Sequence, residues 1–162
     1  MNYIGLPQKD TKKVASKLNI LLASYSVYYQ NLRSFHWHIR GKNFYEIHRL
    51  FEDLYNDAKI KIDDTAERIL TIGQKPLGSM SGFLKHTKIK ESYDIMEDEK
   101  MAAIILNNHK DLIIMIRGVI KIAGDVNDEG TADMLTGFLT YLEKTSWMLS
   151  AWKGKTGAAG TR

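Results

Sequence analysis

The sequence predicts an all-α protein, a four-helix bundle with a short extra helix in the connection between the second and third long helices. Four long stretches carry apolar residues three or four positions apart, which is the period of an amphipathic helix. The 162 residues include only two prolines, Pro7 and Pro76, and 44% are hydrophobic, enough to bury one core. Long helices with short breaks and one long connection are typical of a bundle.

The first predicted helix follows Asp10 or Thr11 as its N-cap and runs to about Trp37. Its apolar stripe consists of Val14, Leu18, Leu21, Leu22, Tyr25, Tyr29 and Leu32. The Arg-Gly-Lys segment at 40–42 interrupts the periodicity, so we expect the chain to turn there.

The second helix is expected from Asn43 to Ile72. Asn43 is the predicted N-cap, and Glu46, three residues later, is its expected partner in a capping box. Gly73 should end this helix, because glycine readily adopts the left-handed conformation that closes helices. The apolar stripe consists of Phe44, Ile47, Leu50, Phe51, Leu54, Ala58, Ile62, Ala66 and Ile69.

The second half of the chain contains a connector and two further helices. The connector, Pro76 to Ser92, is too long for a tight turn, and one short helix is indicated within it by Met80, Phe83 and Leu84. The third long helix spans roughly Tyr93 to Ala123, with Gly124 as its stop, and the fourth covers about Thr131 to Trp152. The resulting domain organisation is an N-terminal extension at 1–10, the bundle at 11–152 and a flexible, glycine-rich tail at 153–162.

Composition excludes several function classes. Cysteine is absent, which excludes disulfide scaffolds, thiolate zinc sites and cysteine catalysis and suits a cytoplasmic location. The opening segment lacks the apolar core of a signal peptide, and no apolar run approaches the roughly eighteen residues of a membrane span. The net charge of +4 permits contact with an anionic polymer but is modest for a dedicated nucleic-acid binder.

Five potential metal ligands lie between positions 36 and 67, and helical geometry indicates that one chain cannot bring them together. Four of them fall on one face of the second helix, within an arc of about 100°. Glu52 and Asp63 are nevertheless roughly 16 Å apart along the axis, too far for one ion. An antiparallel copy of the helix across a two-fold axis would join the two ends. The five ligands are His36, His48, Glu52, Asp63 and Glu67.

The chemistry of these residues favours iron, because imidazole and carboxylate ligands without thiolate suit divalent iron, and carboxylates also tolerate the ferric state. A di-iron centre inside the bundle would need Glu-x-x-His on two helices, and no Glu here is followed three residues later by His. A purely structural interpretation stays open at this point. Carboxylates four residues apart are often a solvated face, and a lone histidine beside an aromatic residue is often structural.

The segment H-W-H-I-R-G-K-N-F-Y-E-I-H-R-L-F-E, followed by D-D-T-A-E-R-I, resembles the signature of the Dps family (DNA protection during starvation) of mini-ferritins. The similarity spans about residues 11–152. It implies a ferritin-like fold and a ferroxidase site in which His36, His48 and Glu52 of one subunit meet Asp63 and Glu67 of its two-fold mate. Many relatives have Asp at the position of Glu52; the longer side chain should preserve ligation, and its effect on the order of iron binding stays open.

The resemblance further implies a hollow shell of twelve subunits that oxidises Fe(II), preferentially with hydrogen peroxide, and stores ferric mineral. Trp37, beside His36, is a candidate to intercept stray oxidising equivalents, with core packing as the alternative. Asp125, Asp128 and Asp133 resemble the acidic residues that line the family's three-fold pores, where carboxylates attract cations. Helix capping is the alternative for Asp128.

The remaining histidines, His38, His86 and His109, have no partner pattern and are predicted to be surface or packing residues. Arg68 is expected to pair with a nearby carboxylate.

Binding to DNA is the remaining partner to consider, because some relatives coat DNA through lysine-rich tails. The terminal cations here are few, so we expect weak and salt-sensitive binding at best, aided by the number of copies in a shell. They are Lys9, Lys12, Lys13, Lys153, Lys155 and Arg162. Three functions of different classes follow: a peroxide-dependent iron store, a structural nucleoid protein, and a plain helical interaction module.

Overall fold

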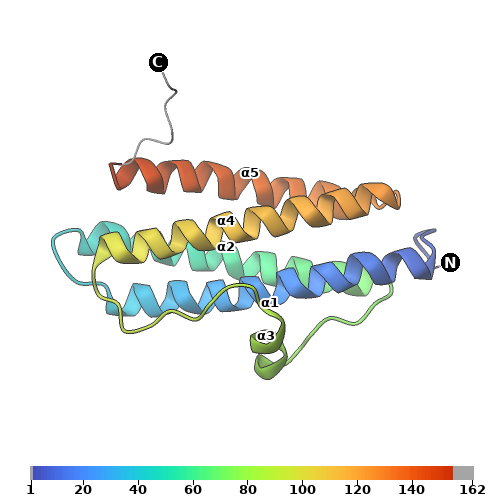
Figure 1. Cartoon of the computed structure of the whole chain (residues 1–162), viewed down its shortest axis with the longest axis horizontal. Helices are drawn as coiled ribbons and strands as arrows, with labels where there is room; N and C mark the ends of the chain where they lie inside the picture. The colour runs from blue at the N-terminus through green and yellow to red at the C-terminus, as the bar shows by residue number, and fades with distance from the viewer. Residues whose placement is uncertain (1, 155–162) are drawn as a thin grey trace, which may run out of the picture.

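The computed structural model describes residues 2–154, and these form five helices connected as Figure 1 shows. The helices are α1 (Gln8–His38), α2 (Phe44–Thr71), α3 (Met80–His86), α4 (Asp98–Asp125) and α5 (Glu129–Trp152). The long helices form two pairs, α1 with α2 and α4 with α5, and α1 also packs against α4 and against the short α3. The predicted bundle with an extra helix in its long connection is confirmed.

The start of α1 lies earlier than the sequence suggested. Pro7 occupies the N-cap position, and its carbonyl accepts hydrogen bonds from the backbone N–H groups of Asp10 and Thr11. The Thr11 hydroxyl donates to the carbonyl of Gln8, one turn back inside the helix, and does not cap it. Asp10 therefore lies in the first turn, where a negative charge interacts favourably with the helix dipole.

The second helix has the predicted extent, but the predicted capping box is wrong. Asn43 occupies the N-cap position without a side-chain cap, because its amide donates instead to the carboxylate of Asp98 at 2.6 Å. The end of α2 is as expected. Gly73 has a φ of +77°, its N–H donates to Leu70, and the next N–H donates to Ile69, the pair of bonds that closes a helix in a Schellman motif.

Both ends of α4 differ from the prediction. The helix begins at Asp98, five residues after Tyr93, because Asp94 has a left-handed φ of 58°. In addition, Arg40 and Glu97 form an isolated parallel β-bridge, which keeps the chain extended before the helix. Gly124 lies inside the last turn and does not end the helix. Asn127, with a φ of 57°, is the left-handed residue that closes it, and the N–H of Asp128 then donates to the carbonyl of Ala123.

The core runs the length of the bundle and contains a polar cluster at its middle. Its apolar part draws on all four long helices, for example Leu18, Leu54, Ile105 and Leu142. The polar part includes an ion pair between Lys61 and Asp57 and the buried ring of His109. No helix among the described residues has both the length and the apolar character to cross a membrane. The predicted tail beyond residue 154 lies outside the described residues.

Candidate metal site between two helices

His36 near the end of α1 and His48 in the first turns of α2 form a stacked pair. The ring centroids are 3.7 Å apart and the ring planes differ by 19°. Each Nδ1 bonds to the backbone carbonyl of the other residue, at 2.7 Å from His36 to His48 and 2.8 Å in return. These reciprocal bonds fix both rings across the turn that separates the helices.

The reciprocal bonds also determine which ring nitrogen can bind a metal. A carbonyl oxygen only accepts hydrogen bonds, so Nδ1 must carry the proton in both His36 and His48. A neutral imidazole protonated at Nδ1 has its lone pair on Nε2, the atom that binds a metal. Among residues 2–154 neither Nε2 has a hydrogen bond. The backbone thus supplies the outer contact that orients a histidine ligand.

Aromatic rings and a carboxylate surround the histidine pair. Phe44 stacks on His48 with centroids 4.9 Å apart, and Tyr55 meets His36 edge-on at 5.3 Å. The Tyr55 hydroxyl donates to Glu52 at 3.4 Å, and Glu52 is exposed one helical turn after His48. His36, by contrast, is buried. His36, His48 and Glu52 are the predicted half-site; the two histidines are in contact, and Glu52 lies exposed one helical turn away.

The other two predicted ligands, Asp63 and Glu67, lie on α2 well beyond this half-site. Because α2 is one continuous helix, Glu52 and Asp63 are separated by roughly 16 Å along its axis. No group of three or more His, Asp or Glu side chains in the described part of the chain is close enough to hold a metal ion. The structure therefore brings together His36 and His48, with Glu52 nearby, and leaves Asp63 and Glu67 apart from them.

The bundle interior carries a cation where a metal centre would need carboxylates. The Lys61 ammonium pairs with Asp57 and lies 3.6 Å from the centroid of the Tyr141 ring. Burial lowers the pKa of Lys61 and raises the pKa of Asp57, and their ion pair opposes both shifts. A buried positive charge paired with a carboxylate disfavours a second cation at this place.

A buried hydrogen-bonded group on α1, α4 and α5 was not recognised in the sequence. The Tyr28 hydroxyl and His109 Nε2 are 2.7 Å apart, and His109 Nδ1 is 2.9 Å from the Ser146 hydroxyl. Burial lowers the pKa of His109 to about 3, so its ring is neutral. The available signal was the position of His109 between Ile105 and Leu112 on the apolar stripe of its helix. His109 packs inside the bundle, and His38 and His86 are at the surface, so the prediction that these three are surface or packing residues is confirmed.

Trp37 does not pack into the core of the chain. Its side chain is 55% exposed, and the Arg33 guanidinium lies 4.8 Å from the centroid of its ring. The core-packing alternative is therefore wrong for this chain on its own, and the role in intercepting oxidising equivalents stays a prediction.

The three aspartates predicted to line a pore lie in different environments. Asp128 is buried and caps α5 by accepting from the N–H of Thr131, and it pairs with Arg68 at 2.5 Å. The expected partner of Arg68 is thereby identified. Asp125 and Asp133 lie nearer the surface. The capping role of Asp128 is confirmed, and the pore stays a prediction for all three.

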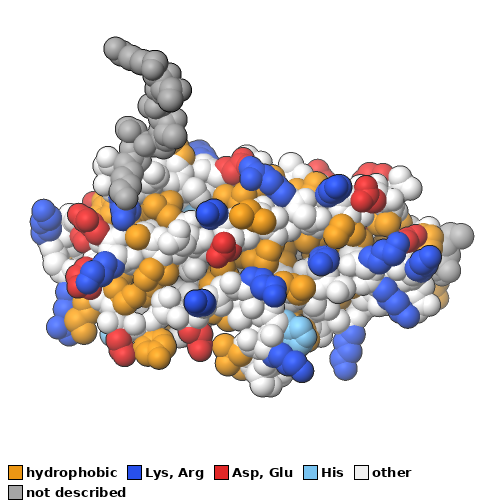
Figure 2. Space-filling view, viewed as in Figure 1, with side chains coloured by type: hydrophobic (Ala, Val, Ile, Leu, Met, Phe, Trp, Pro, Cys, Tyr) orange, Lys and Arg blue, Asp and Glu red, His pale blue; other side chains and the backbone are white. Residues whose placement is uncertain are grey.

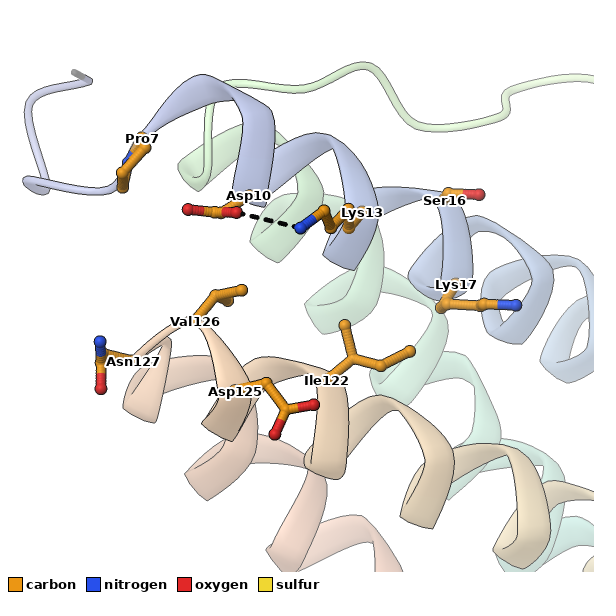
Figure 3. A pocket seen from close by; sticks show the side chains of 9 residues that line it. All are labelled: Pro7, Asp10, Lys13, Ser16, Lys17, Ile122, Asp125, Val126 and Asn127. Atoms are coloured by element: carbon orange, nitrogen blue, oxygen red, sulfur yellow. Dashed lines mark hydrogen bonds and ion pairs between the residues drawn. The ribbon is translucent and has the colours of Figure 1, made fainter.

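Asp125 also lines a groove of about 650 Å³ between the start of α1 and the end of α4, shown in Figure 3. Asp10 and Lys13 on α1 form an ion pair of 3.4 Å on the opposite wall. This groove lies near the end of the bundle opposite the stacked histidines, since α1 runs from one to the other over about 40 Å. It is separate from the candidate metal site.

Comparison with known proteins defines the class. The ferritin-like domain model matches residues 15–158, in agreement with the helical bundle. The DNA protection during starvation protein of Porphyromonas gingivalis is 41% identical over 159 residues, covering 96% of this chain and 98% of the relative. The DNA protection during starvation protein 2 of Bacillus anthracis is 37% identical over 140 residues, 86% of this chain and 96% of the relative.

A solved structure agrees closely with this one. The crystal structure of the Dps protein of Vibrio cholerae O1, described as a member of a broad superfamily of ferritin-like diiron-carboxylate proteins, superimposes with a TM-score of 0.92. Its sequence is 41% identical, and the match covers 94% of this chain and 96% of that one. The present chain belongs to the Dps family of ferritin-like proteins.

Proposed function

We propose that this protein oxidises Fe(II) at sites shared between two copies of the chain and stores the ferric product inside a hollow shell of twelve subunits. The observation that carries the proposal is the stacked pair of His36 and His48. Their reciprocal bonds to backbone carbonyls require the proton on both Nδ1 atoms and leave both Nε2 lone pairs available. Such an arrangement suits a histidine that binds a metal.

The site is incomplete within one chain, and a second copy supplies what is missing. An antiparallel α2 from a two-fold mate brings its Asp63 and Glu67 to His36, His48 and Glu52 of the first chain. Two imidazoles and three carboxylates form a ligand set suited to iron in both oxidation states. The match to a structure described as diiron-carboxylate supports iron as the metal.

Hydrogen peroxide is the proposed oxidant, because two Fe(II) ions held at the interface between two subunits can each give one electron to the same peroxide molecule. Two Fe(II), one hydrogen peroxide and two protons then yield two Fe(III) and two water molecules. One Fe(II) acting alone would release a hydroxyl radical. Asp125 and Asp133, with Asp128 at the start of α5, are the proposed lining of the pores through which iron enters.

The test is an anaerobic Fe(II) titration followed by peroxide, on protein whose assembly mass has been measured. We expect a closed oligomer that binds Fe(II) at saturable sites and oxidises about two Fe(II) per peroxide, as the electron balance requires. The proposal would be contradicted if the protein is a monomer and still oxidises Fe(II) with peroxide, or if it is an oligomer without saturable Fe(II) binding.

Protection of DNA as a structural nucleoid protein is the second candidate, favoured by the names of the relatives and by exposed Lys9, Lys12 and Lys13 in the first turns of α1. On the face in Figure 2, however, Lys and Arg side chains are spread along the molecule with Asp and Glu between them. We therefore expect weak, salt-sensitive binding. A gel-shift titration decides this, and unchanged DNA mobility at low salt would exclude it.

A further inference from the structure

Tyr28 and His109 form a phenol–imidazole pair in the middle of the bundle, far from solvent. Tyr28 is 1% exposed and His109 is fully buried, and their rings meet edge-on with centroids 5.5 Å apart. The phenolic oxygen and Nε2 are 2.7 Å apart. Neither side chain has a role in the proposed iron site.

The direction of this hydrogen bond follows from the group behind it. The Ser146 hydroxyl donates its only proton to the carbonyl of Leu142 at 2.6 Å, so its oxygen must accept from His109 Nδ1 at 2.9 Å. A neutral ring with its proton on Nδ1 accepts at Nε2. The Tyr28 hydroxyl therefore donates to His109, and the imidazole can take up that proton.

Tyr25 provides an internal comparison one turn earlier on α1. It is equally buried, and its ring meets the Tyr28 ring edge-on at 6.1 Å. Its hydroxyl has no hydrogen-bond partner among the described residues. A phenol that loses an electron becomes a strong acid and must release its proton to a base nearby. Of these two buried phenols, only Tyr28 is hydrogen-bonded to a base.

A series of aromatic rings leads from the candidate metal site toward this pair. Tyr55 meets His36 edge-on at 5.3 Å and meets Tyr29 edge-on at 6.0 Å. Tyr29 is the chain neighbour of Tyr28. Each step is thus a ring contact or a covalent neighbour.

We propose that Tyr28 and His109 are a buried redox-active pair that takes up single oxidising equivalents escaping from iron and peroxide chemistry. The source of the oxidant rests on the proposed function. A hydroxyl radical formed at the metal site removes a hydrogen atom from Tyr55 and becomes water. The Tyr55 radical regains an electron from Tyr28 and a proton from solvent, while the Tyr28 proton moves to His109 Nε2.

The pair can be returned to its starting state. One Fe(II) supplies an electron to the Tyr28 radical and becomes Fe(III), and the proton returns from His109 Nε2 to the phenolic oxygen. Tyr28 then donates again to a neutral imidazole, and the net reaction is one further Fe(II) oxidised by the radical.

The experiment is electron paramagnetic resonance of the assembled protein, freeze-quenched after Fe(II) and peroxide are mixed. We expect a tyrosyl radical whose g-tensor shows a hydrogen bond to the phenoxyl oxygen. Tyr28→Phe should abolish this signal, and the matched control Tyr25→Phe should leave it unchanged. His109→Gln keeps an acceptor for the hydroxyl but cannot take up its proton, so the radical yield should fall several-fold.

The wild-type protein gives a second measurement that needs no variant to fold. With ¹⁵N-labelled histidine, electron–nuclear double resonance should show coupling of the radical to an imidazole nitrogen. A radical without this coupling, or one that survives Tyr28→Phe or is undiminished in His109→Gln, would overturn the proposal.

A parallel sample without iron separates this proposal from the proposed function. Here a ruthenium polypyridyl photo-oxidant with persulfate supplies the oxidising equivalents. A Tyr28 radical in this sample alone supports the redox role of the pair. It counts against iron oxidation at the shared site as the source of the radical. A radical elsewhere in both samples overturns the pair, whatever the iron titration shows.

Discussion

The imidazole rings of His36 and His48 stack 3.7 Å apart, and each donates its Nδ1 proton to the backbone carbonyl of the other residue. This relationship joins the end of α1 to the beginning of α2 and presents both Nε2 atoms together. It explains why two histidines twelve residues apart act as one unit, and it leads to the first prediction.

Replacing His36 with Ala should lower Fe(II) affinity by at least about tenfold, because it removes one proposed ligand and releases the ring of His48. His38→Ala is the matched control. His38 is exposed at the end of the same helix and bonds through Nδ1 to the carbonyl of Ser34 in its own helix, so Fe(II) binding should be unchanged. Calorimetric Fe(II) titration under anaerobic conditions measures both. Equal losses in the two variants would argue against the site.

His109 should make the protein less stable as the pH falls below 6.5. Burial lowers its pKa from 6.5 to about 3, so between these values the unfolded chain binds one more proton than the folded one. His109 should therefore decrease the free energy of unfolding on acidification by up to about 1.4 kcal/mol per pH unit. Above pH 6.5 it should make no contribution to the pH dependence.

Urea midpoints measured at constant protein concentration across this pH range test the prediction. His109→Gln should remove this part of the slope. His86→Gln, at an exposed position, should retain it. An identical pH dependence in wild type and His109→Gln would show that the buried ring does not control it.

Gly73→Ala should reduce the free energy of unfolding by about 1–2 kcal/mol, because an added Cβ is strained at a φ of +77°. Gly118→Ala is the control. This glycine lies within α4 with open space where the methyl group of an alanine would project, and alanine favours the helix by about 1 kcal/mol. Thermal unfolding should thus shift downward in the first variant and upward in the second. Similar shifts in both would disprove the left-handed closure.

Asp128→Asn should destabilise the protein by about 3 kcal/mol, because it leaves the largely buried Arg68 without its carboxylate and the Thr131 hydroxyl without its acceptor oxygen. Glu143→Gln breaks the exposed pair with Arg117 and should change the free energy of unfolding by less than about 1 kcal/mol. Denaturant unfolding compares them. A small effect at Asp128 would mean that the ion pair contributes little.

The sequence predicted what depends on local spacing and missed what depends on distant partners. The extent of α2 and its closure at Gly73 followed from the apolar stripe and one glycine. Asn43 occupies the predicted N-cap position, but the capping box with Glu46 was wrong, because the Asn43 amide donates to Asp98 on another helix. The closing residue of α4 was wrong because Asn127 adopts the left-handed conformation that Gly124 was expected to supply.

The site shows the same division. His36 and His48 could be paired from the sequence as ligands at neighbouring helix ends, but their stacking and reciprocal bonds depend on the shape of the turn between them. The contact of Tyr28 with His109 depends on which faces of α1 and α4 meet, and periodicity alone does not fix the rotation of one helix against another.

The most direct test of the shared site is a mixed assembly of His48→Ala and Asp63→Ala subunits, co-expressed with two tags and purified through both. Each variant alone should lack Fe(II) oxidation. In a random mixture, about half of the two-fold interfaces pair the two variants, and each of these has one intact site and one doubly altered site. About one quarter of all sites are then intact, so about one quarter of wild-type activity should return. No recovery in assemblies proven to contain both subunits would contradict a site built from two chains.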